Sequence, residues 1–138
     1  MQYNKETSIG YALTTTLNLL RKHFNREIKK FDLSSEQYGV LKLISEEKQL
    51  TPTQIAELLN RDKATITRIL KSLDNKKLIK KEQINNRSFY VKLTNESEKI
   101  IKEADKIALK YHKKIIDEIG ENKIKEMLST LKKIRDLF

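Results

Sequence analysis

Apolar residues recur every three or four positions over most of the chain, which predicts a mainly helical protein. A long helix is expected to begin near Thr94 or Asn95 and to end at Gly120, with a final helix after it. A helix of about 25 residues is ~37 Å long, more than a small central domain needs, so we expect a second copy of the chain to cover part of it. The first helix is expected over residues 6–30, with one stripe at Ile9, Ala12, Leu13, Thr16, Leu17, Leu20, Phe24 and Ile28.

Two helix starts in the middle of the chain carry the signature of a capping box. Ser34 is placed to cap a second helix, with Gln37 three residues later as its partner. Thr51 and Gln54 repeat this pattern, and Pro52 occupies the first position of the third helix, where proline is favoured. The register of both helices is therefore well defined by the sequence.

The third helix is short and is followed at once by a fourth. It is expected to end near Leu59, because Asn60 can adopt the left-handed conformation that terminates a helix. Asp62 can then cap a helix over residues 63–76. Two helices joined by a turn of this length predict a helix-turn-helix.

A change of periodicity after the fourth helix indicates a β-hairpin. The runs "LIKKEQI" and "FYVKL" are β-prone, the second alternates apolar and polar residues, and "NNRS" between them is turn-like. A hairpin directly after a helix-turn-helix predicts a winged helix. The expected fold class is mainly α with a small β-hairpin wing (α+β), with a winged helix-turn-helix at 33–94 and helical dimerisation segments at 1–32 and 95–138.

The fourth helix has two unlike faces. Ile66, Ile69, Leu70 and Leu73 have the spacing of one buried face. The other face has small or hydroxyl side chains and cations with almost no acid, which suits entry into the major groove of double-stranded DNA. We expect Arg68 to reach guanine and the lysines to meet phosphates; the full set on this helix is Lys63, Ala64, Thr65, Thr67, Arg68 and Lys71.

Two further segments are candidates for DNA contact. Asn85, Asn86 and Arg87 at the hairpin tip can reach an adjacent minor groove, where arginine is favoured. Thr53, Gln54 and the first amides of the third helix can hold a phosphate.

The charge distribution supports a polyanionic partner. The net charge is +10, of which +6 lies in residues 51–94 and +2 in each flank. A lysine-rich helix face is usually only solvated, but the caps, the turn, the hairpin and this local excess agree with one another. The absence of cysteine excludes a thiol redox switch. No run approaches the ~18 apolar residues of a membrane span, and no secretory leader is present, so a cytoplasmic protein is expected.

The sequence resembles the MarR family of winged-helix transcriptional regulators over nearly its full length. The residues that match are "LTPTQIAELLNRDKATITRILKSLDNKKLI" and "NNRSFYVKLT". The resemblance implies a homodimer joined through its terminal helices, a pseudo-palindromic operator, repression, and release by a small ligand. Two positions depart from the family pattern: Asn85 stands where the wing usually has Asp, and Ser97 replaces a common glycine, a change expected to have little effect.

The resemblance also implies a cleft for an aromatic anion, beside the alternative that its aromatic residues are simply core. The candidates are Arg21, His23, Phe24, Tyr38 and Tyr111. No cofactor or metal is expected, since His23 and His112 are the only histidines and neither has a helical partner ligand. No motif of a phosphate loop or activated nucleophile is present, so the chain is not expected to be an enzyme. Two rival functions stay open: a metal-responsive regulator, and a winged-helix protein-interaction module without DNA binding.

Overall fold

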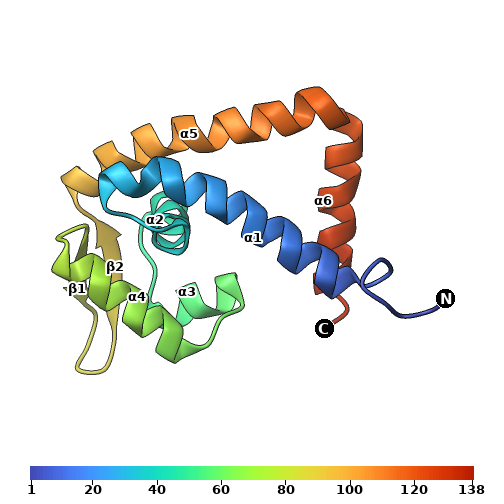
Figure 1. The fold of residues 1–138 in the computed structure, drawn as a ribbon. Helices are drawn as coiled ribbons and strands as arrows, with labels where there is room; N and C mark the ends of the chain where they lie inside the picture. The colour runs from blue at the N-terminus through green and yellow to red at the C-terminus, as the bar shows by residue number, and fades with distance from the viewer. The chain divides into compact units, whose positions relative to one another are not determined.

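The computed structural model describes all 138 residues, and its chain divides into two compact units, Met1–Ala104 and Asp105–Phe138. The first unit holds a winged helix-turn-helix, and the long fifth helix runs from it into the second (Figure 1). The elements in chain order are α1 (Ile9–Ile28), the short 3₁₀ helix η1 (Lys29–Phe31), α2 (Ser35–Glu47), α3 (Pro52–Leu59), α4 (Lys63–Asn75), β1 (Ile79–Gln83), β2 (Phe89–Leu93), α5 (Asn95–Ile119) and α6 (Glu121–Arg135). The predicted fold class is confirmed.

The helix starts follow the predicted caps. In α2, the Ser34 side chain accepts from the Gln37 backbone N–H and the Gln37 side chain accepts from the Ser34 backbone N–H, which closes a capping box. The first helix begins three residues later than predicted, because the Ser8 hydroxyl caps it by accepting from the Tyr11 N–H at 3.1 Å. The long helix ends at Ile119 because Gly120 takes a φ of 104°, which helical residues do not adopt.

The core of the first unit lies where α4 packs against α2, α3 and β1. Burying such aliphatic side chains is the main favourable term that holds the unit together. The largest side chains with no exposed surface come from α1, α2, α3, α4 and β2, namely Ile28, Leu41, Ile44, Ile55, Ile66, Leu73 and Val91.

The hairpin is joined to the helix-turn-helix by hydrogen bonds as well as by packing. Strands β1 and β2 are antiparallel, in a register that pairs Ile79 with Leu93 and Gln83 with Phe89. Leu50, just before α3, adds a third strand position: its N–H donates to the Val91 carbonyl at 3.2 Å and its carbonyl accepts from the Val91 N–H at 2.7 Å. The wing therefore has a fixed attachment beside α3.

Ser97 has a structural role that the sequence did not predict. It is fully buried at the start of α5. Its hydroxyl oxygen accepts a hydrogen bond from the Thr94 N–H, and its O–H group donates to the Thr94 carbonyl, both at 3.0 Å. The expectation that this replacement has little effect did not anticipate these bonds, because glycine has no side chain that can cap the helix in this way.

No helix in the structure combines the length and the apolar character that crossing a membrane requires.

Candidate nucleic-acid interface

Helix α4 has one buried face and one exposed face, as the sequence pattern predicts. Ile66 and Leu73 are fully buried, and Ile69 and Leu70 nearly so. The opposite face carries the side chains that can meet a polyanion, and all of them are exposed: Lys63, Ala64, Thr67, Arg68 and Lys71. A rigid helix thus presents two small side chains and three cations to solvent.

Thr65 differs from the other predicted contact residues. It is half-buried, and its hydroxyl donates to the Asp62 carboxylate at 2.6 Å. The Thr65 backbone N–H donates to the same carboxylate at 3.0 Å, so Asp62 caps α4 as predicted. These bonds, with the hydroxyl contributing most, hold the pKa of Asp62 below its ordinary value of 3.8. In the free protein the Thr65 hydroxyl is therefore part of the helix cap.

The turn between α3 and α4 is fixed at both ends. Asn60 has the predicted left-handed conformation, with φ of 52° and ψ of 47°. The Arg61 N–H donates to the Ala56 carbonyl at 2.9 Å, and the Arg61 guanidinium lies 3.1 Å from the Glu36 carboxylate of α2. This turn sets α4 relative to α3 without a glycine.

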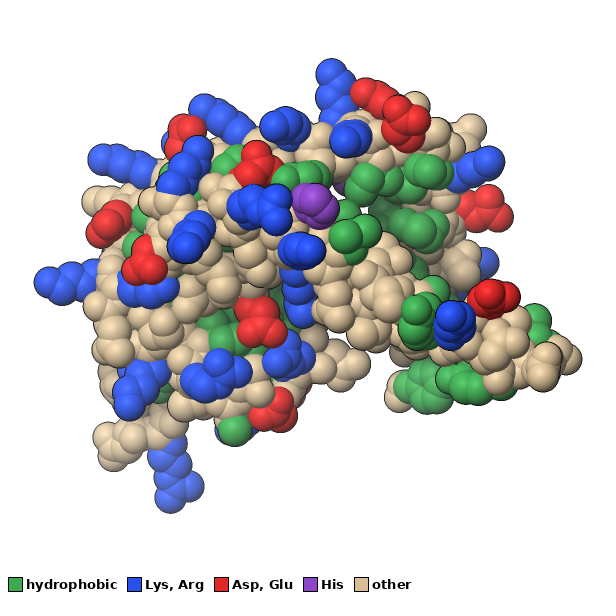
Figure 2. All heavy atoms as spheres, viewed as in Figure 1, with side chains coloured by type: hydrophobic (Ala, Val, Ile, Leu, Met, Phe, Trp, Pro, Cys, Tyr) green, Lys and Arg blue, Asp and Glu red, His purple; other side chains and the backbone are tan.

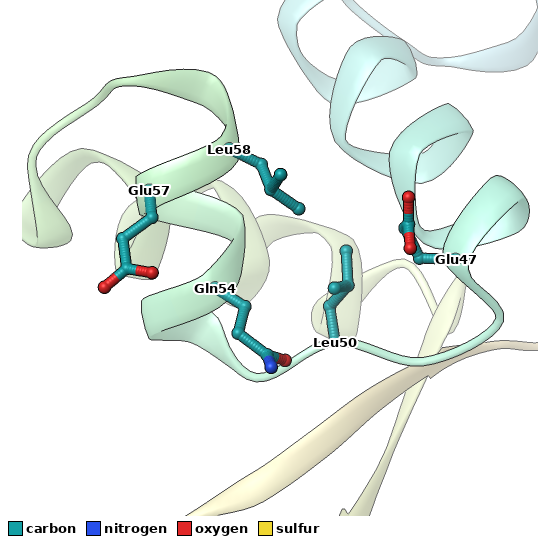
Figure 3. Close-up of a pocket in the computed structure, with 5 residues that line it drawn as sticks. All are labelled: Glu47, Leu50, Gln54, Glu57 and Leu58. Carbon is teal, nitrogen blue, oxygen red and sulfur yellow. The ribbon is translucent and has the colours of Figure 1, made fainter.

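At the start of α3, the two predicted phosphate-binding residues are in different situations. Thr53 is exposed. The Gln54 side-chain oxygen is held in the capping box, where it accepts from the Thr51 N–H at 2.9 Å. Gln54 lines a surface hollow of about 350 Å³ together with Glu47, Leu50, Glu57 and Leu58. Figure 3 shows the Gln54 side chain beside that of Leu50. The two carboxylates at this hollow are unfavourable for a phosphate, so Thr53 and the backbone amides are the better candidates.

The wing turn is organised by Asn85. Its side-chain oxygen accepts from the Arg87 N–H at 2.8 Å, the Ser88 N–H at 3.0 Å and the Ser88 hydroxyl at 3.2 Å. An amide oxygen can accept from backbone donors as an aspartate would in this position. Asn86 and Arg87 are exposed at the tip, so the departure from Asp leaves the wing arginine presented to solvent.

The base of the wing carries paired cations. Lys81 lies 3.9 Å from the Asp74 carboxylate, and its ammonium group stands 5.0 Å from the centre of the Phe89 ring. Lys92 pairs with Glu82 across the hairpin. Figure 2 shows lysine and arginine side chains over the region of α4 and the hairpin, at the lower left of the view, with few acidic ones between them.

None of the residues expected to bind a small ligand lines the hollow beside Gln54. Phe24 and Tyr38 pack edge to face, with ring centres 5.0 Å apart. Arg21 is half-buried and His23 exposed, while Tyr111 lies in the other compact unit. No group of three or more histidine, aspartate or glutamate side chains is arranged to hold a metal ion.

The fold and the exposed face of α4 together define a winged helix-turn-helix protein. Residues 33–88 match the model of the MarR family. Over this segment, which holds the helix-turn-helix and the start of the wing, the chain is similar to the MarR family of transcriptional regulators. Regulators of this family are not enzymes, in agreement with the sequence prediction.

Relatives and solved structures cover almost the whole chain. The chain is 24% identical to the transcriptional regulator MgrA of Staphylococcus aureus, over 99% of this chain and 94% of that protein. It is 25% identical to FarR of Neisseria gonorrhoeae, over 96% of this chain and 94% of FarR. Its fold matches the crystal structure of the S. aureus MepR–DNA complex with a TM-score of 0.84 and 21% identity, covering 94% of this chain and 96% of MepR.

Proposed function

We propose that this chain is a homodimeric repressor that binds double-stranded DNA of pseudo-palindromic sequence. Each α4 would enter a major groove, and each wing would contact an adjacent minor groove. In a two-fold dimer, the two α4 helices then meet half-sites about 34–36 Å apart on one face of the duplex. When bound at a promoter, such a dimer would block transcription of the downstream gene.

The exposed face of α4 is the observation that carries this proposal. The small side chains Ala64 and Thr67 allow the backbone to approach the base edges, and Arg68 on the same face can donate two hydrogen bonds to guanine. Lys63 and Lys71 flank this centre and suit the phosphates on either side. The structures of related regulators solved with DNA, such as MepR, support the same use of the fold.

Exposed apolar side chains on the outer helices support a homodimer. Leu13 and Leu17 of α1 are each 45% exposed, and Leu128 of α6 is 51% exposed. Single chains rarely leave so many large apolar groups in water unless a partner covers them. We therefore assign dimerisation to residues 1–32 and 95–138, and the DNA-binding function to residues 33–94.

A small aromatic ligand is a further part of the proposal. The edge-to-face pair of Phe24 and Tyr38, with Arg21 and His23 nearby in sequence, offers aromatic surface and positive charge. Such a ligand would shift the population of dimers away from the DNA-binding arrangement.

Selection of bound sequences from a random DNA pool tests this function. We expect a recovered motif with two-fold symmetry and a half-site spacing of about one helical turn. A gel-shift series against salt should show affinity falling steeply as salt rises. DNA binding that is absent or independent of salt would favour a protein-interaction module, and a loss of affinity on adding a chelator would favour a metal-responsive regulator.

A further inference from the structure

Gln37 connects α2 to the recognition helix α4. Its side-chain N–H group donates to the Ser72 hydroxyl of α4 at 3.0 Å. Its side-chain oxygen accepts from the Lys76 ammonium group at 3.1 Å, and also from the Ser34 N–H at 3.1 Å. One half-buried amide therefore holds the Ser72 side chain of α4 and the Lys76 side chain at the C-cap of α4, while it closes the capping box of α2.

The same contacts continue towards α1. The Lys76 ammonium group donates to the Asp32 carbonyl and lies 3.8 Å from the Asp32 carboxylate. Asp32 ends the short helix η1 in a left-handed conformation, and Asn25 of α1 accepts from the Ser35 N–H at 2.6 Å. A continuous set of polar contacts thus runs from α1 through the start of α2 to the last turns of α4.

These contacts lie on the helix that carries the proposed base-reading residue. Ser72 is four residues beyond Arg68, about one turn further along α4, and Lys76 is eight residues beyond it, at the C-cap of the helix. The apolar packing of Ile66, Ile69 and Leu73 is not directional and permits small shifts of a helix along or about its axis. Hydrogen bonds have a narrow range of distance and angle, so these bonds favour one position and rotation of α4.

We infer that Gln37 is a positioning residue for α4, which through Ser72 and Lys76 determines how well the helix discriminates between base sequences. The inference rests on the proposed DNA-binding function. Readout of base edges requires side chains held to within about 0.5 Å, whereas phosphate attraction tolerates larger displacements. Loss of the Gln37 contacts should therefore reduce sequence discrimination more than it reduces general affinity for DNA.

The competing explanation is that Gln37 serves only as a helix cap, and three variants separate the two. Gln37→Met keeps the length of the side chain and removes every polar contact. Gln37→Glu keeps the capping box, accepts from Lys76, and can accept a hydrogen bond from a rotated Ser72 hydroxyl. Ser34→Ala removes the cap hydroxyl and leaves the contacts of Gln37 with α4 in place.

The experiment measures the ratio of affinities for a selected binding site and for random DNA, together with stability in urea. For Gln37→Met we expect the ratio to fall about three- to tenfold, the size expected for loss of one or two hydrogen bonds, with an unchanged salt slope on random DNA. Gln37→Glu should keep the wild-type ratio. Ser34→Ala should lower stability and leave the ratio unchanged.

Ser72→Ala provides a second route to the same conclusion if Gln37→Met folds poorly. It should also lower the ratio of affinities. The ratio should fall less in the double variant Gln37→Met/Ser72→Ala than the two single variants together would give, because both substitutions remove the same hydrogen bond between Gln37 and Ser72. An unchanged ratio in Gln37→Met or in Ser72→Ala overturns the inference, and so does an equal loss in Ser34→Ala. Wild-type protein with no preference for any sequence would instead overturn the proposed function, a result visible before any variant is made.

Discussion

The carboxylate of Asp62 accepts two hydrogen bonds from Thr65, one from the side-chain hydroxyl at 2.6 Å and one from the backbone N–H at 3.0 Å. This pair fixes the first turn of α4, directly before the exposed residues proposed to meet DNA. Both bonds favour the ionised carboxylate, and they hold its pKa below the ordinary value of 3.8.

Acid should therefore weaken the start of α4. A carboxyl group whose pKa is lower in the folded protein contributes stability above its unfolded pKa, and this contribution is lost as the pH falls through the folded pKa. Asparagine caps helices as well as aspartate but does not titrate in this range. We expect the difference in unfolding free energy between the wild type and Asp62→Asn to shrink as urea unfolding is measured from about pH 6 to about pH 2.

Asp62→Ala is the matched variant that removes the cap at every pH. It should be less stable than Asp62→Asn at neutral pH, with the first turn of α4 exchanging amide hydrogens faster. Equal stability of Asp62→Asn and the wild type at all pH values would show that the charge of Asp62 contributes nothing to folding.

Arg68 and Lys71 should affect DNA binding in different ways. Arg68→Ala removes a proposed bidentate contact to guanine, so specific binding should weaken by ~1–3 kcal/mol and one base preference should relax. Lys71→Ala removes a proposed phosphate contact, so all sequences should weaken similarly and the salt slope should fall by about one. Titrations of selected and random duplexes at several salt concentrations measure both; the same effect of each variant on both duplexes would contradict these roles.

At the wing, Asn85 and Asn86 are expected to act differently although they are neighbours of the same type. Asn85→Ala removes the acceptor for three hydrogen bonds of the turn, so Arg87 would lose its fixed position and DNA affinity should fall about three- to tenfold. Asn85→Asp should retain affinity, because a carboxylate accepts the same bonds.

Asn86→Ala is the comparison for that prediction: Asn86 is exposed at the same tip and is itself a proposed groove contact, but its removal leaves the Asn85 acceptor in place, so its loss of affinity should be smaller than that of Asn85→Ala. A gel shift with the selected duplex compares the three variants. If Asn85→Ala binds as tightly as the wild type, the order of the turn has no bearing on DNA binding.

The elements of this fold could be predicted because their signals are local. The capping boxes at Ser34 and Thr51, the left-handed Asn60 and the cap at Asp62 each depend on residues within three or four positions, and all are present in the structure. The first helix was predicted to start too early because Ser8 was not recognised as its cap. The exposure of the α4 face also followed from periodicity alone.

Tertiary contacts could not be predicted in this way. Gln37 and Ser72 are 35 residues apart in the sequence. The sequence patterns placed each residue in its own helix but did not show that their side chains form a hydrogen bond. The backbone pairing of Leu50 with Val91 depends on how the hairpin folds back, which no local pattern shows. The sequence predicted that Gln54 takes part in a helix cap. Only the structure shows that its side-chain oxygen accepts from the Thr51 N–H, which limits the phosphate contact proposed for this residue.

The apolar surface of α1 leads to a prediction about assembly. Leu17 is 45% exposed in the single chain, and a carboxylate there would be buried without a partner if another copy covers this surface. We expect Leu17→Glu to shift the protein from dimer to monomer in sedimentation velocity and to weaken DNA binding, because a monomer meets only one half-site. Leu58→Glu is the matched control: it makes the same change at a leucine of α3 that is 55% exposed and lies in the helix-turn-helix, outside the segments assigned to dimerisation. A monomeric wild type, or a monomer produced equally by both variants, would contradict the assignment of dimerisation to the outer helices.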